Sequence, residues 1–411
     1  MFSGLIKNEY IKLFSKKKTY IILGLYILLS IIIAMIGESF EKSYFRYKDP
    51  DYLIENINHQ IQYEKEYLDS IQNDSSIDED EKEMLLKNSN EHIETLKEEI
   101  KRLEERKKTG EYDWREEYRE QIAANESIIK EIEAKGNLSK DDLNQVNYMK
   151  QDIERLNILL STDTSPEDEN VNTGINYLYN NLLMVTSAFL SFGLILFSSD
   201  SVSGEYNPGT LKFLLIQPVT RIKVLLSKFV VTALSSVTLI LGGQALFFVI
   251  VGLIKGFGKL SRPMLVGQEF EKVIYDGFEM FQRIAGSGEY IPLWNYILRM
   301  LILEIFLIIT VTAFIFMVST ISKSSVVANT MCISIMLGST IVYNLSSSYR
   351  KISHLIFLNF GDIDGIVSGS IISNTGKVVF TPINVIIVCV ITTIVFVLVS
   401  LGVFKKRDLL I

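Results

Sequence analysis

Cysteine, histidine and proline are scarce in this chain of 411 residues, which contains 2 Cys, 3 His and 7 Pro. Both cysteines, Cys332 and Cys389, lie in long apolar runs, so the charged parts of the chain must fold without disulfides. The histidines have no cysteine neighbours at metal-ligand spacing, and no serine or cysteine stands in a nucleophile motif. These absences argue against a disulfide scaffold, a metal site and a hydrolytic enzyme.

A glycine-rich phosphate loop is also missing from the sequence. Such a loop ends in Gly-Lys-Ser or Gly-Lys-Thr, because its backbone amides and lysine cradle the phosphates of a nucleotide. No stretch of the chain has this ending. We therefore expect no nucleotide-hydrolysing domain of that type in this polypeptide.

Hydrophobic residues are abundant instead, at 48% of the chain. They gather in six runs that are long enough to cross a bilayer, which takes about 20 helical residues. The first run ends in Met35-Ile36-Gly37-Glu38, which lacks the small-x-small pattern of a cleaved signal, so we interpret it as a retained anchor. The predicted spans are 19–36, 177–199, 229–254, 293–318, 326–345 and 383–404.

The charges are unevenly distributed along the chain. Residues 38–176 hold 36 acidic and 19 basic side chains, a net charge of −17, although the whole chain carries only −7. Lysine and arginine close to spans stay preferentially in the cytoplasm. They cluster before span 1, between spans 2 and 3, at Lys323 and after span 6, so both termini are predicted to be cytoplasmic.

The predicted fold is an all-α membrane protein with six transmembrane helices. It adds an N-terminal interfacial amphipathic helix and an extracellular α-helical coiled-coil domain between spans 1 and 2. Besides the spans, the predicted segments are the interfacial helix 1–18, the extracellular domain 37–176, the cytoplasmic loop 200–228, the external loop 255–292, the cytoplasmic loop 319–325, the external segment 346–382 and the cytoplasmic tail 405–411.

The predicted extracellular domain shows a regular apolar pattern. Between Asp51 and Leu160, apolar residues recur at alternating steps of three and four, which is the period of a coiled-coil seam. Breaks fall at 73–76, at Gly110 and at Gly136-Asn137, and Ser139 and Asp142 are spaced as a helix cap. We expect four helices in two antiparallel hairpins, with the many charges on solvated faces.

The loop between spans 2 and 3 carries the most specific motif. An acidic residue is followed by Gly-Thr-Leu, further apolar residues, proline and arginine, and a lysine then leads into the next span. This order resembles the ABC type-2 permease family, and the resemblance covers the six spans but not the external domain. The residues that carry it are Glu205, Gly209, Thr210, Leu211, Leu214, Leu215, Pro218 and Arg221.

The resemblance implies a coupling helix that docks in a groove of an ATPase subunit. Residues 209–216 can form a short helix with Leu211, Leu214 and Leu215 on one face, and Pro218 would end it. Glu205 and Arg221 would then supply charges at a polar rim. The alternative is an ordinary cytoplasmic loop with positive-inside lysines.

The N-terminal residues and the segment before span 6 carry two further similarities. Apolar residues from Phe2 to Phe14 share a helical face flanked by lysines, as in a helix that lies in the membrane interface. The resemblance implies that this helix transmits ATPase movement to span 1, and the alternative is a plain anchor. Segment 346–382 is too short and interrupted to span, and it resembles the re-entrant external helices of the family.

Three polar residues of the predicted spans are candidate functional residues. Glu304 lies in the middle of span 4, where a carboxylate is costly and usually faces protein or water. Arg299 lies five residues away and does not share its helical face, and Asn344 lies near the end of span 5. Substrate contact and structural contact between helices both remain open for Glu304.

The resemblance implies an exporter permease in the bacterial plasma membrane, with both termini cytoplasmic. Its expected partners are a cytoplasmic ABC ATPase, a second identical or related permease subunit and membrane lipid, with no nucleic acid. The chain itself would bind no cofactor, because ATP and Mg would bind the ATPase. Candidate cargoes include peptides, lipids, polysaccharides, drugs and sodium; the external helical domain favours peptide or envelope cargo, such as an antimicrobial peptide or a lipid-like molecule.

Two other functions compete with export. The phage-infection-protein family joins a coiled external domain to similar spans and can act as a scaffold or receptor without an ATPase, although the motif from Gly209 to Arg221 argues against this. An ABC mechanotransmission component would instead use ATP to move the external domain, and four spans would suit that class better than six.

Overall fold

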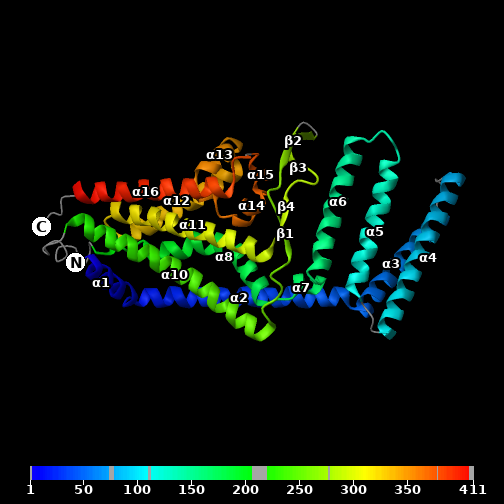
Figure 1. Cartoon of the computed structure of the whole chain (residues 1–411), viewed down its shortest axis with the longest axis horizontal. Coiled ribbons are helices and arrows are strands. Elements are labelled where there is room, and N and C mark those ends of the chain that lie inside the picture. The colour runs from blue at the N-terminus through cyan, green and yellow to red at the C-terminus, as the bar shows by residue number, and fades with distance from the viewer. Residues whose placement is uncertain are drawn as a thin grey trace.

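The computed structural model describes residues 2–73, 78–109, 113–205, 220–275, 278–376 and 378–406, with the backbone alone described at 185–191, 275, 278 and 279. The described residues are predominantly helical, as predicted. The molecule is elongated, with an apolar helical bundle at one end and a separate group of helices at the other (Figure 1). The first helix and the end of the last helix lie at the same end of the bundle, away from that group.

The bundle helices follow the predicted apolar runs to within a few residues at most ends. Among the described residues, five helices are long and apolar enough to cross a membrane: α2 (Lys17–Lys48), α10 (Arg221–Lys255), α11 (Leu293–Ile321), α12 (Ser325–Leu345) and α16 (Pro382–Lys406). A sixth helix, α8 (Gly174–Ser198), coincides with the predicted second span and contains residues 185–191. Its crossing of the membrane stays a prediction.

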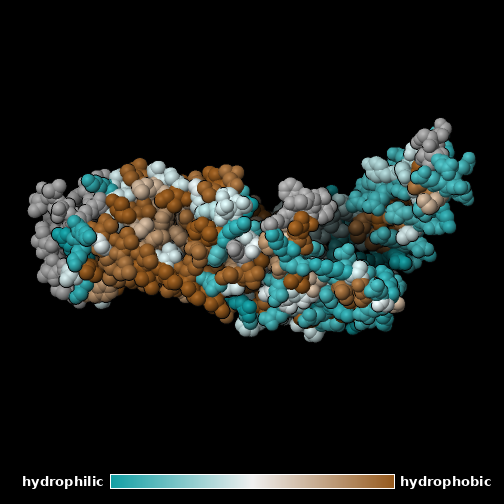
Figure 2. Space-filling view, turned by 90° about the horizontal axis from the view of Figure 1, so that it is seen from above, coloured by the Kyte–Doolittle hydropathy of each residue, from teal (hydrophilic) through white to brown (hydrophobic). Residues whose placement is uncertain are grey.

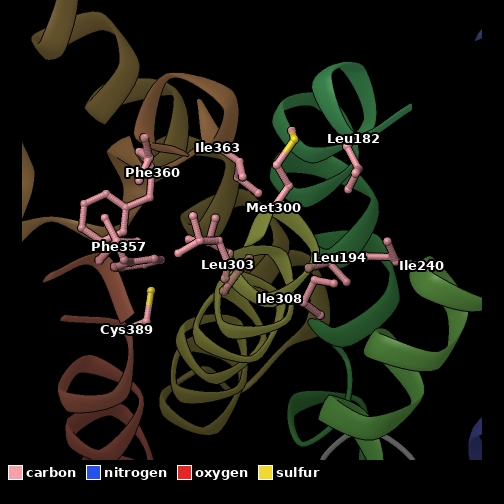
Figure 3. Close-up of a cluster of buried hydrophobic side chains, with 14 of the residues drawn as sticks. Leu182, Leu194, Ile240, Met300, Leu303, Ile308, Phe357, Phe360, Ile363 and Cys389 are labelled. Atoms are coloured by element: carbon pink, nitrogen blue, oxygen red, sulfur yellow. The ribbon is translucent and has the colours of Figure 1, made fainter. Parts of the chain in front are cut away.

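Helix α11 forms the centre of the bundle. It packs against α8, α10, α12 and α16, and most of its length is buried. Figure 3 shows how Leu303 and Ile308 of α11 lie between Leu194 of α8 on one side and Phe357 near α16 on the other. On the face that Figure 2 shows, apolar residues cover most of the bundle, whereas hydrophilic residues predominate at the opposite end of the molecule. An apolar surface of this extent is expected of a protein that lies in lipid.

The other group of helices, here called the helical insertion, consists of α3 (Pro50–Asn73), α4 (Glu79–Thr109), α5 (Trp114–Glu133) and α6 (Lys140–Ser161). Helices α3 and α4 pair along a seam of Ile57, Ile61, Ile93 and Leu96, and α5 and α6 form a second pair. The structure therefore forms the two predicted hairpins. Their description as a coiled coil and their extracellular location stay predictions.

The local helix signals in the insertion were informative. The Ser139 side chain accepts a hydrogen bond from the backbone of Asp142, whose carboxylate accepts one from the backbone of Ser139, so the predicted cap is a capping box.

Helix α2 continues to Lys48, well past the predicted end of span 1, and a short helix α7 (Pro166–Asn170) leads from α6 back to α8. The insertion is thus attached to the bundle by one continuous helix and one short connection.

The predicted external loop 255–292 contains four short strands, which the sequence analysis did not predict. Strands β1 (Pro263–Val266) and β4 (Glu289–Pro292) form one antiparallel pair, and β2 (Phe270–Tyr275) and β3 (Phe278–Arg283) form another. The sequence signal was the Asp276-Gly277 dipeptide between two β-prone runs, which is a strong hairpin pattern. The α5–α6 hairpin contacts this region, since the Gln151 amide donates to the Ser287 carbonyl at 3.0 Å.

Segment 346–382 forms short interrupted helices: α13 (Ser347–Ile352), η2 (Ser353–Leu355), η3 (Phe357–Asn359), α14 (Ile363–Ser368) and α15 (Ile371–Thr375). Apolar residues of this segment join the main core between α11 and α16. Two tyrosine hydroxyls, of Tyr179 and Tyr296, donate to Asp364 at 2.9 and 2.7 Å. Irregular backbone is thus covered by protein, as membrane depth requires, although a re-entrant position stays a prediction.

Candidate functional site

Seven charged residues meet where both ends of the described chain lie, and we call this group the terminal junction. It joins helix α1 (Phe2–Phe14), the start of α2, the turn η1 (Ser203–Glu205) and the start of α10. Its members are Glu9, Lys12, Lys16, Lys18, Asp200, Glu205 and Lys228.

Helix α1 brings Glu9 to the junction on an otherwise apolar face. Leu5, Glu9 and Leu13 follow one another at four-residue steps, which places them on one side of the helix, and all three are buried. This side packs against α10. The predicted amphipathic helix is therefore present, but its inner face carries a carboxylate as well as leucines.

Lys228 connects two of the three carboxylates of the junction, Glu9 and Glu205. Its side chain is only 3% exposed, and its Nζ lies 2.8 Å from Glu9 Oε2 and 2.7 Å from Glu205 Oε1. Lys12 of α1 also pairs with Glu205 Oε1. A buried charge is tolerated when it is paired and hydrogen-bonded, so these contacts hold α1, η1 and α10 in one arrangement.

Asp200 forms the second half of the junction. It lies just beyond the end of α8 and pairs with Lys16, at 3.1 Å, and with Lys18. These two lysines lie on either side of the start of α2. The end of α8 is thereby tied to the connection between α1 and α2.

Both carboxylates of the η1 region are held in the charged form. Burial opposes the ionisation of Glu205, but attraction by Lys228 and the hydrogen bonds from Lys12 and Lys228 outweigh it and lower its pKa. Burial likewise opposes the ionisation of Asp200, and Lys18 and Lys16 lower its pKa in the same way. Glu205 and Asp200 are therefore ionised near neutral pH.

A serine of α11 extends these contacts to the centre of the bundle. The Ser319 hydroxyl accepts hydrogen bonds from the backbone N–H groups of Val202 and Ser203, at 3.2 and 3.0 Å. It also donates to the carbonyl of Ser199 at 2.6 Å. A displacement of η1 would consequently act on α8, α10 and α11 together.

The predicted coupling motif lies directly beside the junction. Its central members, Gly209, Thr210, Leu211, Leu214, Leu215 and Pro218, fall within 206–219 and lie outside the described residues. Glu205 precedes this segment and is buried, so it does not lie at an exposed polar rim. Arg221 is the first residue of α10 and is exposed. Of the two charged residues that flank the motif, one is thus buried and the other is exposed.

Glu304, the intramembrane candidate, is completely buried inside the chain. Its Oε1 accepts a hydrogen bond from Nε2 of Gln244 on α10 at 2.9 Å. The neighbouring Gly243 lies against the Tyr26 ring of α2, where any larger side chain would overlap that ring. Glu304 therefore contributes to the contact between α10 and α11, which favours a structural role over substrate contact.

The other two intramembrane candidates make contacts within short stretches of chain. Arg299 Nε donates to Asn295 Oδ1 of the same helix at 3.2 Å, and this contact does not involve Glu304. The Asn344 side chain donates to the Thr340 carbonyl at 2.9 Å, also within its own helix. The structure does not bring Glu304, Arg299 and Asn344 into one site.

The junction residues other than Glu205 were not predicted as a site. The sequence analysis assigned the lysines to the positive-inside pattern, which explains their side of the membrane but not their partners. The available signal was Glu9, an acidic residue at the four-residue spacing of two leucines on an amphipathic helix. Such a position requires a buried cation, and Lys228, the last residue before the predicted span 3, supplies it.

Comparison with known proteins supports the resemblance to the ABC type-2 permease family. A search among curated proteins gave no match. A family model described as ABC-2 family transporter protein matches residues 6–409, nearly the whole chain. Members of this family are membrane transport subunits rather than the ATPases that they work with. The chain belongs to the ABC-2 transporter family and is a permease subunit of an ABC transporter.

Proposed function

We propose that this permease exports its substrate from the cell with energy from ATP that a separate ATPase subunit hydrolyses. ATP and Mg would bind that subunit, and segment 206–219 of this chain would dock on it. The observation that carries the proposal is the terminal junction, because it connects both flanks of this segment to the bundle helices. Movement of the ATPase would be passed on through these contacts.

Segment 206–219 is attached to the bundle helices at both of its ends. It begins directly after Glu205, which is paired with α1 and α10, and it ends directly before the start of α10. A force on the segment therefore acts on α10 from two sides. Since Ser319 holds the η1 backbone, the same force also reaches α11, the central helix.

The topology that suits this proposal places the junction in the cytoplasm and the helical insertion outside a bacterial plasma membrane. The lysines around the junction support this orientation. Two permease subunits, identical or related, would enclose the path. The insertion supports a peptide or an envelope component as cargo, because it adds a large hydrophilic surface on the far side.

Mechanotransmission is a second candidate function, and the course of α2 favours it. This helix runs from Lys17 to Lys48 without a break and leads into α3, so movement at the junction can reach the insertion directly. Export and mechanotransmission share the ATPase and differ in whether a substrate crosses the membrane. Transport into inverted vesicles distinguishes them.

The experiment is to co-express the chain with a candidate ABC ATPase subunit and to measure copurification. We expect the wild-type chain to retain the ATPase and the Leu214→Asp, Leu215→Asp double variant to lose it, because two buried carboxylates disfavour docking of an apolar face. A matched control is Leu143→Asp, an exposed residue of α6. Failure of the wild-type chain to bind any ATPase would contradict the proposal and favour a scaffold.

A further inference from the structure

A groove lies between α2 and α10, at the end of the bundle that is near the helical insertion. It has a volume of about 530 Å³, and Phe247 and Val251 of α10 form part of its apolar base. Its sides are lined by Ile31, Ala34 and Met35 of α2 and by further residues of α10. Figure 1 shows the end of α10 beside α2 at this level.

The apolar part of the groove extends into one leaflet of a bilayer. Its apolar residues on α10 run from Phe247 to Ile254, which corresponds to about 10 Å at 1.5 Å per residue. A leaflet contributes about 15 Å to the hydrocarbon core. The apolar part of the groove lies within the predicted spans, and its charged end lies just beyond them, so it runs from the leaflet interior to the headgroup level.

The mouth of the groove contains two lysines and two glutamates. Lys255 Nζ lies 2.8 Å from Glu38 and 3.2 Å from Glu41, and Lys42 lies 3.5 Å from Glu38. The Lys42 side chain is 75% exposed, and an exposed ion pair of this kind is weak. Lys42 can therefore exchange its contact with Glu38 for a phosphate at little energetic cost.

We propose that this groove binds a phospholipid from the leaflet on the insertion side. One acyl chain lies against Phe247 and Val251, and the phosphate contacts Lys42, with Lys255 beside it. The combination of an apolar slot that opens at the headgroup level and an exposed lysine at its mouth is complementary to one such molecule. The site differs from the terminal junction and does not depend on the export proposal.

The exposed lysine at the mouth favours a phospholipid over another apolar occupant of the groove. A transmembrane helix of a second copy would cover the groove but would not need a cation at the headgroup level. Met35 and Ile254, which line the groove, are 67% and 74% exposed in this chain. Both kinds of occupant would cover these side chains, so the experiment must separate them.

The test uses the full-length chain in nanodiscs that contain a phosphatidylglycerol with a photoreactive group near the end of one acyl chain. After irradiation, mass spectrometry locates the labelled peptides. We expect labelling of 31–42 and 247–255 to exceed that of other lipid-facing segments about fivefold, which corresponds to a binding preference of roughly 1 kcal/mol. Uniform labelling would overturn the proposal.

Two groove-filling variants and one control sharpen the result. Ala34→Phe fills the acyl-chain slot from α2, and Ile250→Trp fills it from α10. Each variant should therefore abolish the preferential labelling of the groove segments. Ile27→Phe adds the same ring to an exposed position of α2 outside the groove and should leave the preference unchanged. Equal labelling of the filled variants and wild type would contradict an acyl chain in this groove.

The headgroup contact has its own test. Lys42→Gln should reduce labelling by phosphatidylglycerol and leave labelling by a photoreactive diacylglycerol, which lacks the phosphate, unchanged. Lys65→Gln on α3 serves as the control, since this exposed lysine lies outside the groove. Spontaneous disulfide dimers of a Met35→Cys variant, together with absent lipid labelling, would assign the groove to a second copy and refute the lipid site.

Discussion

The terminal junction and the helical insertion use the same charged residue types in opposite ways. In the junction, Lys228 is buried between Glu9 and Glu205, and each charge is fixed by a partner from another element. In the insertion, pairs such as Lys97 and Glu94 lie on one helix and are largely exposed. Exposed pairs contribute little to stability, whereas breaking a buried pair is expensive.

The difference shows that the number of charges is a poor guide to their function. Most acidic residues of the protein lie in residues 38–176, where they solvate helices whose stability comes from apolar seams. The few charges of the junction instead hold together the helices on which force from an ATPase would act. The following predictions test this contrast, from the largest expected effect to the smallest.

Removing the cation of the junction should have the largest effect. Lys228→Met keeps the aliphatic stem but leaves Glu9 and Glu205 buried with less compensation, so we expect a loss of about 3–5 kcal/mol. The measurement is thermal stability of the purified protein by size-exclusion chromatography. Lys97→Met on α4 is the matched control and should change stability by no more than about 0.5 kcal/mol.

A charge-neutral variant distinguishes the effect of uncompensated buried carboxylates from that of simple packing damage. The triple variant Lys228→Met, Glu9→Gln, Glu205→Gln removes the uncompensated carboxylates and should recover much of the lost stability. If the triple variant is as unstable as Lys228→Met, the ion pairs do not explain the loss of stability, and the site depends on packing alone.

Truncating the apolar seam of the insertion should have the next largest effect. Leu156 of α6 is 2% exposed and packs with Tyr118 of α5, so Leu156→Ala should cost about 2–5 kcal/mol through lost contacts and a cavity. Limited proteolysis of the full-length protein should show faster cleavage in α5 and α6. Leu143→Ala, at an exposed position of α6, should be cleaved at the wild-type rate.

The hydrogen bond inside the bundle should matter less. Gln244→Leu removes the donor to Glu304, and hydrogen bonds between membrane helices contribute about 0.6–2 kcal/mol. We expect a loss of stability in this range in a detergent unfolding titration. Arg299→Gln should have a smaller effect because its contact lies within one helix. A larger effect for Arg299→Gln would indicate that Arg299, not Glu304, fixes the interhelical contact.

Acidification should weaken the junction over a defined pH range. The folded pKa of Glu205 lies below its ordinary value of 4.5, so the folded state favours its charged form. The resulting stabilisation is present above about pH 4.5 and is lost as the pH falls through the folded pKa. The stability difference between wild type and Glu205→Gln should therefore be constant above this value and shrink below it; a constant difference at all pH values would contradict the assignment.

The sequence predicted the elements of both regions better than the contacts between them. Long apolar runs and heptad spacing depend on local periodicity, which explains why the bundle helices and the two hairpins were placed correctly. The pairing of Lys228 with Glu9 joins residues far apart in the chain, and periodicity carries no such information. The strands at 263–292 were missed because the alternating pattern around Asp276-Gly277 is short and was interpreted as a loop.

The two predicted functional sites illustrate the same limit. The coupling motif stays a prediction from residue order, whereas the fold shows that Glu205 faces the junction and not an exposed rim. Glu304 was singled out by its position in a span, and its partner Gln244 comes from a different helix. A charged residue in an apolar run signals a contact, while the identity of the contact is a property of the packed bundle.

The most direct test of the junction is ATP hydrolysis by the complex of this permease and its ATPase in nanodiscs, normalised to the amount of bound ATPase. We predict that Glu205→Gln retains the ATPase but lowers turnover by about fivefold or more, as expected for the loss of a coupling free energy between sites. Glu94→Gln in the insertion should hydrolyse ATP at the wild-type rate. Equal turnover of Glu205→Gln and wild type would contradict transmission through the terminal junction.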